Sequence, residues 1–184
     1  MIAAALMLAL VEVVTLTPRL RLDLRYATAR NFTHQRLYAH ARCLLQAPVA
    51  ARLGDVEREL RARGLGLLVF DCYRPLSVQR RMWALVPDER YVSDPAKGSR
   101  HNRGAAVDVT VVDGRGHPLA MPSDYDDFSV RAHRDYAGGS DEARANRALL
   151  EAVMARHGFV GLPTEWWHFD AAEWQSYPIS DEPL

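Results

Sequence analysis

The sequence predicts an α+β fold, a single domain in which helices flank a central antiparallel sheet. The chain has 184 residues, which suits one domain and is short for two. Its expected helices and hairpin strands follow one another without the strand–helix–strand rhythm of a parallel sheet. We therefore expect one domain over residues 1–184, large enough to bury its own hydrophobic core.

The chain begins with an apolar segment, residues 1–19, whose first part is MIAAALMLALVEVVTL. An apolar first strand or helix would explain this composition. The alternative is the remnant of a secretory signal, although a basic start is missing and Glu12 interrupts the run before any clear small-residue cleavage site. The run is too short to cross a membrane, so no stable membrane insertion is expected.

A helix, a buried strand and a second helix are predicted next. Residues 48–64 carry apolar side chains at helical spacing, namely Val49, Leu53, Val56 and Leu60. Residues 65–71, LGLLVFD, form a short continuous apolar run that predicts a buried strand. Pro75 suits the start of a helix over 75–86.

The second half of the chain predicts a hairpin, a long loop, a helix and a last strand. The run VDVTVV alternates valines with polar residues, and Asp113-Gly114 can turn the chain into a return strand. Residues 122–140 are rich in Asp, Ser, Gly and Tyr, which indicates a functional loop. Ser140 can cap a helix that ends at Gly158, and a final strand is expected to carry TEWWHFD, residues 164–170.

Composition excludes some classes of partner. The 23 basic and 23 acidic residues give a formal net charge of zero, so the chain lacks the positive field typical of proteins that bind nucleic acid or anionic lipid. With 48% hydrophobic and 25% charged residues, it resembles an ordinary globular protein. We expect no nucleic-acid partner, and the sequence does not indicate an oligomeric state.

The two cysteines, Cys43 and Cys72, do not by themselves make a disulfide framework or a four-ligand zinc site. They are either two small buried apolar residues or, in an exported protein, one disulfide bridge. The sequence leaves both alternatives open, and with them a cytoplasmic or a periplasmic, exported location.

The candidate metal ligands are two histidines and one aspartate. Asp108 lies among valines on a predicted strand, where a carboxylate needs a partner. His101 precedes it by seven residues, and His168 can supply a third ligand. Two imidazoles and a carboxylate are a common catalytic zinc set, which leaves a position for water and lowers its pKa to about 7. A buried, hydrogen-bonded His and Asp without metal would explain the same spacing.

Glu165 and Arg74 are the candidate catalytic residues. Glu165 is three residues before His168, so the two share a face on a helix or turn and point apart on a regular strand. A glutamate beside zinc-bound water can take a proton from that water. The adjacent Trp166-Trp167 would exclude bulk water from the site and raise the pKa of the Glu165 carboxyl. Arg74 is held between a strand and a proline, where a guanidinium can stabilise an oxyanion. No Gly-x-Ser-x-Gly elbow, P-loop or dinucleotide fingerprint competes.

Five blocks in this order resemble one known family: DLRYATARNF (23–32), DCYRP (71–75), SRHNRGAAVD (99–108), SDYDDF (123–128) and EWWHF (165–169). The family is the zinc D-alanyl-D-alanine dipeptidases of the vancomycin-resistance type, which are related to zinc D-Ala-D-Ala carboxypeptidases and to the hedgehog domain. The resemblance runs from about residue 20 to 170 and implies the same small α+β domain around an antiparallel sheet.

The resemblance implies one zinc ion per chain, with a short D-amino-acid dipeptide as substrate. It implies zinc ligands His101, Asp108 and His168, with Glu165 as the general base and Arg74 on the scissile carbonyl. It also implies contacts with the two ends of the dipeptide from Tyr26, Ser99 and Asp126, with Tyr26 and Asp126 near the ammonium group.

Two departures from the family pattern concern the substrate and not the metal. The stretch between Arg74 and Ser99 is short, and Met121-Pro122 stands where the family usually has Met-Gly. The alternatives are therefore a peptidoglycan D,D-carboxypeptidase or endopeptidase with the same zinc site, and a non-catalytic, hedgehog-like zinc-binding domain. Such a domain would not need Glu165 or Arg74, and this chain retains both.

Overall fold

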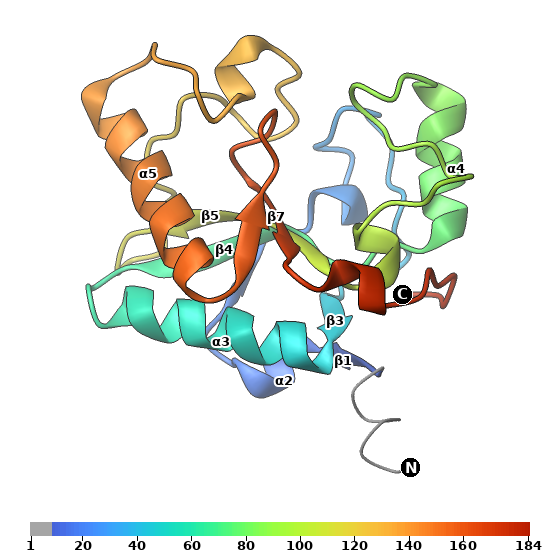
Figure 1. Cartoon of the computed structure of the whole chain (residues 1–184), viewed down its shortest axis with the longest axis horizontal. Helices are drawn as coiled ribbons and strands as arrows, with labels where there is room; N and C mark the ends of the chain where they lie inside the picture. The colour runs from blue at the N-terminus through green and yellow to red at the C-terminus, as the bar shows by residue number, and fades with distance from the viewer. Residues whose placement is uncertain (1–8) are drawn as a thin grey trace.

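The structure is a computed structural model that describes residues 9–184. Its centre is a five-stranded sheet in the order β2–β4–β5–β7–β6 (Figure 1). The strand bounds are Arg21–Leu22 for β2, Gly66–Asp71 for β4, Ala106–Val112 for β5, Phe159–Gly161 for β6 and His168–Ala171 for β7. Neighbours pair antiparallel except β2 and β4, which are parallel. The chain is a single α+β domain with a mostly antiparallel sheet, as the sequence predicts.

A second, two-stranded sheet pairs β1, Leu10–Glu12, with β3, Leu44–Gln46. The short helix α2, Val13–Leu16, follows β1 directly. This part of the apolar segment 1–19 therefore forms a strand and a helix, whereas residues 1–8 of that segment lie outside the described residues. Among residues 9–184, every helix is too short or too polar to cross a membrane.

Helices α3, Ala47–Arg61, and α5, Asp141–Arg156, contact each other and the central sheet. Figure 1 shows α3 running along one side of the sheet. The four apolar side chains that the sequence places at helical spacing in α3 are completely buried: Val49, Leu53, Val56 and Leu60. The predicted cap of α5 is confirmed, since the Ser140 hydroxyl accepts a hydrogen bond from the Ala143 N–H.

Helix α4, Leu76–Leu85, begins after Pro75 and is braced by the C-terminal segment. The first N–H groups of a helix have no partner within it. In α4, Leu76 N–H donates to the Ser180 carbonyl and Ser77 N–H donates to the Asp181 carboxylate. Figure 1 shows the C-terminus close to α4. The strand end at Asp71 and the start of α4 are therefore held in a fixed relation.

The expected hairpin after β5 is only partly formed. The chain does turn back, and Leu119 N–H donates to the Val111 carbonyl. The expected return strand is absent from the described residues, which show only an isolated bridge between Val112 and Pro118. Two backbone hydrogen bonds flank this bridge, from Asp113 N–H to the His117 carbonyl and from Leu119 N–H to the Val111 carbonyl.

A disulfide joins Cys43 and Cys72. It ties the residue before β3 to the residue after β4, and both sulfur-bearing residues are buried. Of the two alternatives that the sequence leaves open, the structure contains the bridge.

Replacing both cysteines with alanine is expected to lower the free energy of unfolding by about 3–4 kcal/mol, because a bridge that closes a loop of this length removes that much entropy from the unfolded chain. The sequence separation is 29 residues. Urea unfolding of the oxidised protein, the reduced protein and the double variant measures the effect. The reduced protein should follow the double variant, and equal stability of all three would contradict a contribution from the bridge.

Candidate functional site

Three polar side chains lie in a row across the central sheet. Strand pairing places Asp71 of β4 opposite Asp108 of β5, and Asp108 opposite His168 of β7. Residues directly opposite each other on neighbouring antiparallel strands project from the same face. The row therefore brings two carboxylates and one imidazole together from three separate parts of the chain.

His101 reaches this row from the turn before β5. It begins the 3-10 turn η2, His101–Arg103, and Gly104, at φ 62°, leads the chain out of the turn in a left-handed conformation that suits glycine. The imidazole Nδ1 lies 2.6 Å from the carbonyl oxygen of Cys72. Because a carbonyl only accepts, Nδ1–H donates and the neutral ring presents the lone pair of Nε2.

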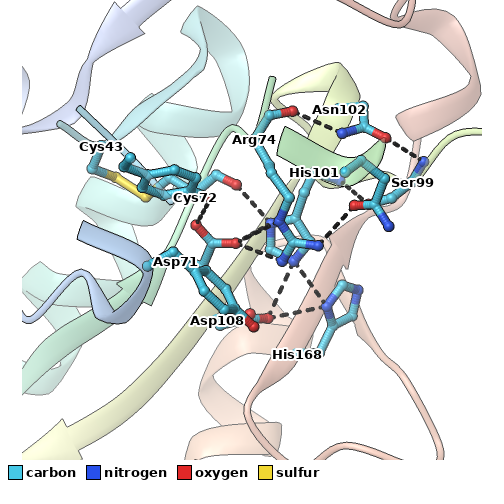
Figure 2. A network of polar contacts seen from close by, with 12 residues as sticks. Cys43, Asp71, Cys72, Arg74, Ser99, His101, Asn102, Asp108 and His168 are labelled. Atoms are coloured by element: carbon cyan, nitrogen blue, oxygen red, sulfur yellow. Dashed lines mark hydrogen bonds and ion pairs between the residues drawn. A yellow bond between two sulfur atoms is a disulfide. The ribbon is translucent and has the colours of Figure 1, made fainter. Parts of the chain in front are cut away.

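Asp170 orients His168 in the same way. It is two residues further along β7, on the same face of the strand, and its Oδ1 lies 2.8 Å from His168 Nε2. Nε2–H therefore donates to Asp170, and Nδ1 faces the other two ligands. His168 Nδ1 lies 3.0 Å from Asp108 Oδ1 and 3.2 Å from His101 Nε2 (Figure 2).

The geometry of the three donor atoms fits a zinc ion. His101 Nε2 lies 3.3 Å from Asp108 Oδ1, and Tyr125 donates to the other oxygen of Asp108. Tetrahedral zinc, with bonds of about 2.0–2.1 Å, separates its ligand atoms by about 3.3 Å. When both imidazoles are neutral, the lone pairs of His101 Nε2, His168 Nδ1 and Asp108 Oδ1 converge with no hydrogen between them. A cation between the three atoms would stabilise this arrangement. His101, Asp108 and His168 are therefore a buried candidate metal site.

The electrostatics of this cluster also favour a cation. Burial by itself would lower the pKa of His168, but hydrogen bonds to Asp108 and Asp170 outweigh it and raise this pKa to about 10. Burial likewise opposes ionisation of Asp108, yet His101 and His168 hold its pKa well below the usual value. The carboxylates thus stabilise positive charge between them, as a proton on His168 or as a metal ion.

Glu165 faces the same site because the chain bends sharply before His168. Glu165 N–H donates to the Leu162 carbonyl at 3.3 Å, and His168 N–H donates to the Glu165 carbonyl at 3.4 Å. Such turns bring their first and fourth residues together, and Glu165 Oε2 lies 3.9 Å from His168 Nδ1. The expected strand over 164–170 is therefore wrong for its first four residues, because β7 begins at His168.

The two tryptophans fix this bend. Trp166 donates from Nε1 to the Ser123 hydroxyl at 2.9 Å, and the Trp167 carbonyl accepts from Val109 N–H of β5 at 3.0 Å. Both side chains are buried. Desolvation raises the pKa of the Glu165 carboxyl, although the neighbouring His168 opposes the rise. The Glu165 side chain keeps 21% of its surface exposed.

Arg74 is fixed by two buried acceptors. Its Nε and Nη2 donate to Asp71 Oδ2 at 3.2 and 2.7 Å, and its Nη1 donates to Gln79 Oε1 at 2.8 Å. Tyr38 donates to the second oxygen of Asp71 at 2.6 Å. A guanidinium has five N–H donors, so one N–H on each terminal nitrogen of Arg74 has no partner among these groups.

Tyr26 and Asp126 form a pair at the other end of the site. The Tyr26 hydroxyl donates to Asp126 Oδ1 at 3.0 Å, and the Phe32 N–H donates to Asp126 Oδ2 at 3.3 Å. Burial raises the pKa of Asp126 to about 7, although the hydrogen bond from Tyr26 opposes the rise. Ser99 is also buried, and its hydroxyl accepts from His101 N–H at 3.0 Å, which leaves the O–H free to donate.

One cavity of about 70 Å³ is lined by all eight residues that the sequence singles out. These residues are Tyr26, Arg74, Ser99, His101, Asp108, Asp126, Glu165 and His168. The cavity is much smaller than the roughly 300–1,000 Å³ of common ligand pockets. The structure thus brings the eight side chains together, and the role of each in catalysis or binding stays a prediction.

The groups that orient the site residues were not predicted from the sequence. Asp170 could have been found, because a residue two positions after His168 on a strand lies on its face. Asp71 could have been found as a carboxylate three residues before Arg74. The Cys72 carbonyl and the Tyr125 hydroxyl give no sequence signal, because their contacts depend on how distant segments pack.

Replacing Asp126 with asparagine is expected to change the pH dependence of stability. The wild-type folded state binds this proton more tightly than the unfolded chain, since the pKa rises from 3.8 to about 7. The wild type should therefore lose stability relative to the variant as pH rises from 4 to 7. Asparagine suits the left-handed backbone at this position, φ 61°. Urea unfolding at pH 4 and pH 8 measures the difference, and a pH-independent difference would contradict the raised pKa.

Comparisons with known proteins point to one family. Residues 7–181 match the family model described as Peptidase_M15, D-ala-D-ala dipeptidase. The D-alanyl-D-alanine dipeptidase of Escherichia coli K12 is 38% identical over 170 residues, which cover 92% of this chain and 88% of that protein. The D-alanyl-D-alanine dipeptidase of Streptomyces coelicolor is 31% identical, covering 84% of this chain and 87% of that protein. The one from Enterococcus faecalis V583 is 29% identical, covering 89% and 87%.

Two of the solved structures to which the chain is similar are of vancomycin-resistance D,D-peptidases. A mutant of the D,D-pentapeptidase VanY in complex with Zn(II) superposes with a TM-score of 0.47 at 19% identity, over 73% of this chain and 75% of that chain. VanYB in complex with D-alanine-D-alanine gives the same values.

Proposed function

Because the chain belongs to the peptidase M15 family of D-Ala-D-Ala dipeptidases, we propose that it hydrolyses D-Ala-D-Ala, or a similar short D-amino-acid dipeptide, with one zinc ion per chain. Membership makes it a metallopeptidase; the substrate, the metal and the role of each residue are the proposal. One observation carries it: three convergent donor atoms, an acid–base group and a guanidinium line a single small cavity.

Zinc suits the donor set of His101, Asp108 and His168. A zinc ion there would act as a Lewis acid and lower the pKa of a bound water to about 7. The protein supports such an ion through the groups behind the ligands, since the Cys72 carbonyl and Asp170 fix which nitrogen of each imidazole is free.

Glu165 is proposed to move the protons of the reaction. Its carboxylate takes a proton from the attacking water and delivers it to the amine that leaves when the peptide C–N bond breaks. The raised pKa of Glu165 supports this role, because a carboxyl with higher proton affinity accepts the proton more readily. Addition of one water across the bond yields two free D-alanines.

Arg74 is proposed to hold the oxygen of the scissile carbonyl. Arg74 lines the cavity and has two N–H groups without a partner in Asp71 or Gln79, and its bonds to these two residues hold the guanidinium in place. Donors that are fixed before the reaction stabilise the negative charge that develops on this oxygen without rearranging.

The ends of the dipeptide are proposed to bind to the remaining polar groups. Asp126 and Tyr26 suit the ammonium group, because an ammonium ion would favour the ionised form of a carboxylate whose pKa is raised to about 7 when the site is empty. The free O–H of Ser99 suits the carboxylate end. The small volume of the cavity supports a short substrate over a long peptide.

A substrate panel tests this function. Purified, zinc-loaded protein should release D-alanine from D-Ala-D-Ala faster than it cleaves L-Ala-L-Ala or a peptidoglycan pentapeptide that ends in D-Ala-D-Ala. Cleavage of the pentapeptide without cleavage of the dipeptide would instead make the protein a D,D-carboxypeptidase. Zinc binding without hydrolysis of any of the three would make it a non-catalytic zinc-binding domain.

A further inference from the structure

A second hollow lies next to the cavity of the candidate site. Its volume is about 290 Å³, and its lining includes Asp127, Val130 and His133 from the loop before α5. Three side chains line both spaces: Tyr91, Phe128 and Glu165. These residues therefore form the boundary between a small inner cavity and a larger outer hollow.

The aromatic part of this boundary is a stacked pair. The rings of Tyr91 and Phe128 lie with centroids 4.5 Å apart and planes at 27°. Phe128 also meets Phe32 edge to face, at a centroid distance of 5.2 Å. Tyr91 comes from the segment between α4 and η2, and Phe128 from the loop between β5 and η3. The boundary thus depends on contact between two loops.

The stacked pair closes the cavity at the end where the amine of a substrate is proposed to bind. Phe128 is two residues after Asp126, and Phe32, its edge-to-face partner, donates its backbone N–H to Asp126. A substrate extended beyond its amino group would have to pass the position of these rings. The space for that extension exists in the outer hollow, which Asp127 also lines. The carboxylate of Asp127 accepts from Ser129 N–H and lies 3.8 Å from Arg131 Nε.

We propose that the Tyr91–Phe128 pair sets the substrate length by separating the two spaces, and that removing either ring admits peptides of three or more residues. This inference rests on the proposed function, because it concerns which peptides reach the same candidate site. The added residue would occupy the outer hollow, with its ammonium group near Asp127.

The test compares hydrolysis of D-Ala-D-Ala and D-Ala-D-Ala-D-Ala by the wild type, Phe128→Ala and Tyr91→Ala. The ratio of kcat/KM for the tripeptide to that for the dipeptide should rise at least tenfold in each variant. Val130→Ala is the matched control, because Val130 lines only the outer hollow and is 64% exposed. Its ratio should equal that of the wild type.

The outcomes separate this inference from the function on which it rests. A wild type that does not cleave D-Ala-D-Ala refutes the proposed function. A wild type that cleaves both peptides equally well overturns the inference alone, as do variants that cleave the dipeptide with an unchanged ratio. Because the two substitutions lie on different loops, and Phe128→Leu offers a milder change, loss of folding in one variant leaves the others to decide.

Discussion

Replacing Glu165 with glutamine is expected to lower kcat for D-Ala-D-Ala by a factor of about 10²–10⁴, the usual contribution of a positioned acid–base group. Glutamine keeps the size of the side chain, but an amide cannot take the proton of the attacking water. The turn that carries it should persist, because its hydrogen bonds are made by backbone groups and by the tryptophans.

Zinc binding should survive this substitution. Glu165 Oε2 lies 3.9 Å from His168 Nδ1, farther than the separations between the three donor atoms, so Glu165 stands beside the ligand set. The measurement is kcat together with zinc per chain, for Glu165→Gln and for Glu142→Gln, an exposed glutamate on α5. Near-full activity of a zinc-loaded Glu165→Gln variant would show that another group moves the protons.

Replacing Arg74 with lysine is expected to lower kcat and kcat/KM together by a factor of about 10²–10³, which is typical for the loss of an oxyanion donor. The charge is kept, but an ammonium group cannot bind Asp71 and Gln79 and also hold two further N–H groups in fixed positions. Lysine is a better test than alanine, because alanine would leave the completely buried Asp71 without a cationic partner and destabilise the fold.

The control for this variant is Arg81→Lys, on the exposed side of α4. It should leave both kinetic constants unchanged. Steady-state kinetics and thermal unfolding should be measured on the same samples. If Arg74→Lys lowers stability while kcat is unaffected, then Arg74 has a structural role only.

The ligand residues could be predicted from the sequence because their types are unusual for their positions. A carboxylate among buried valines, as at Asp108, requires a partner. The family resemblance implies His101 and His168 as the other two ligands. The register that places Asp108 opposite His168 could not be predicted, because it depends on the pairing of β5 with β7, which are distant in sequence.

Two secondary-structure predictions were wrong for local reasons. Spacing alone could not decide whether residues 164–167 were strand or turn, and Pro163 in the first of the two turns was the available signal. The return strand expected after Asp113-Gly114 is reduced to one bridge at Pro118, which the alternation of the preceding valines does not reveal. The Tyr91–Phe128 pair has no sequence signal, because two loops must fold before their rings meet.

We propose that zinc held by His101, Asp108 and His168 makes this chain a D-Ala-D-Ala hydrolase. The most direct measurement is the rate of D-alanine release from D-Ala-D-Ala as zinc is added back to chelator-treated protein. We expect no activity without zinc and a linear rise in rate that ends at one zinc per chain. Full activity in the zinc-free protein, or zinc bound at one per chain without any release of D-alanine, would contradict it.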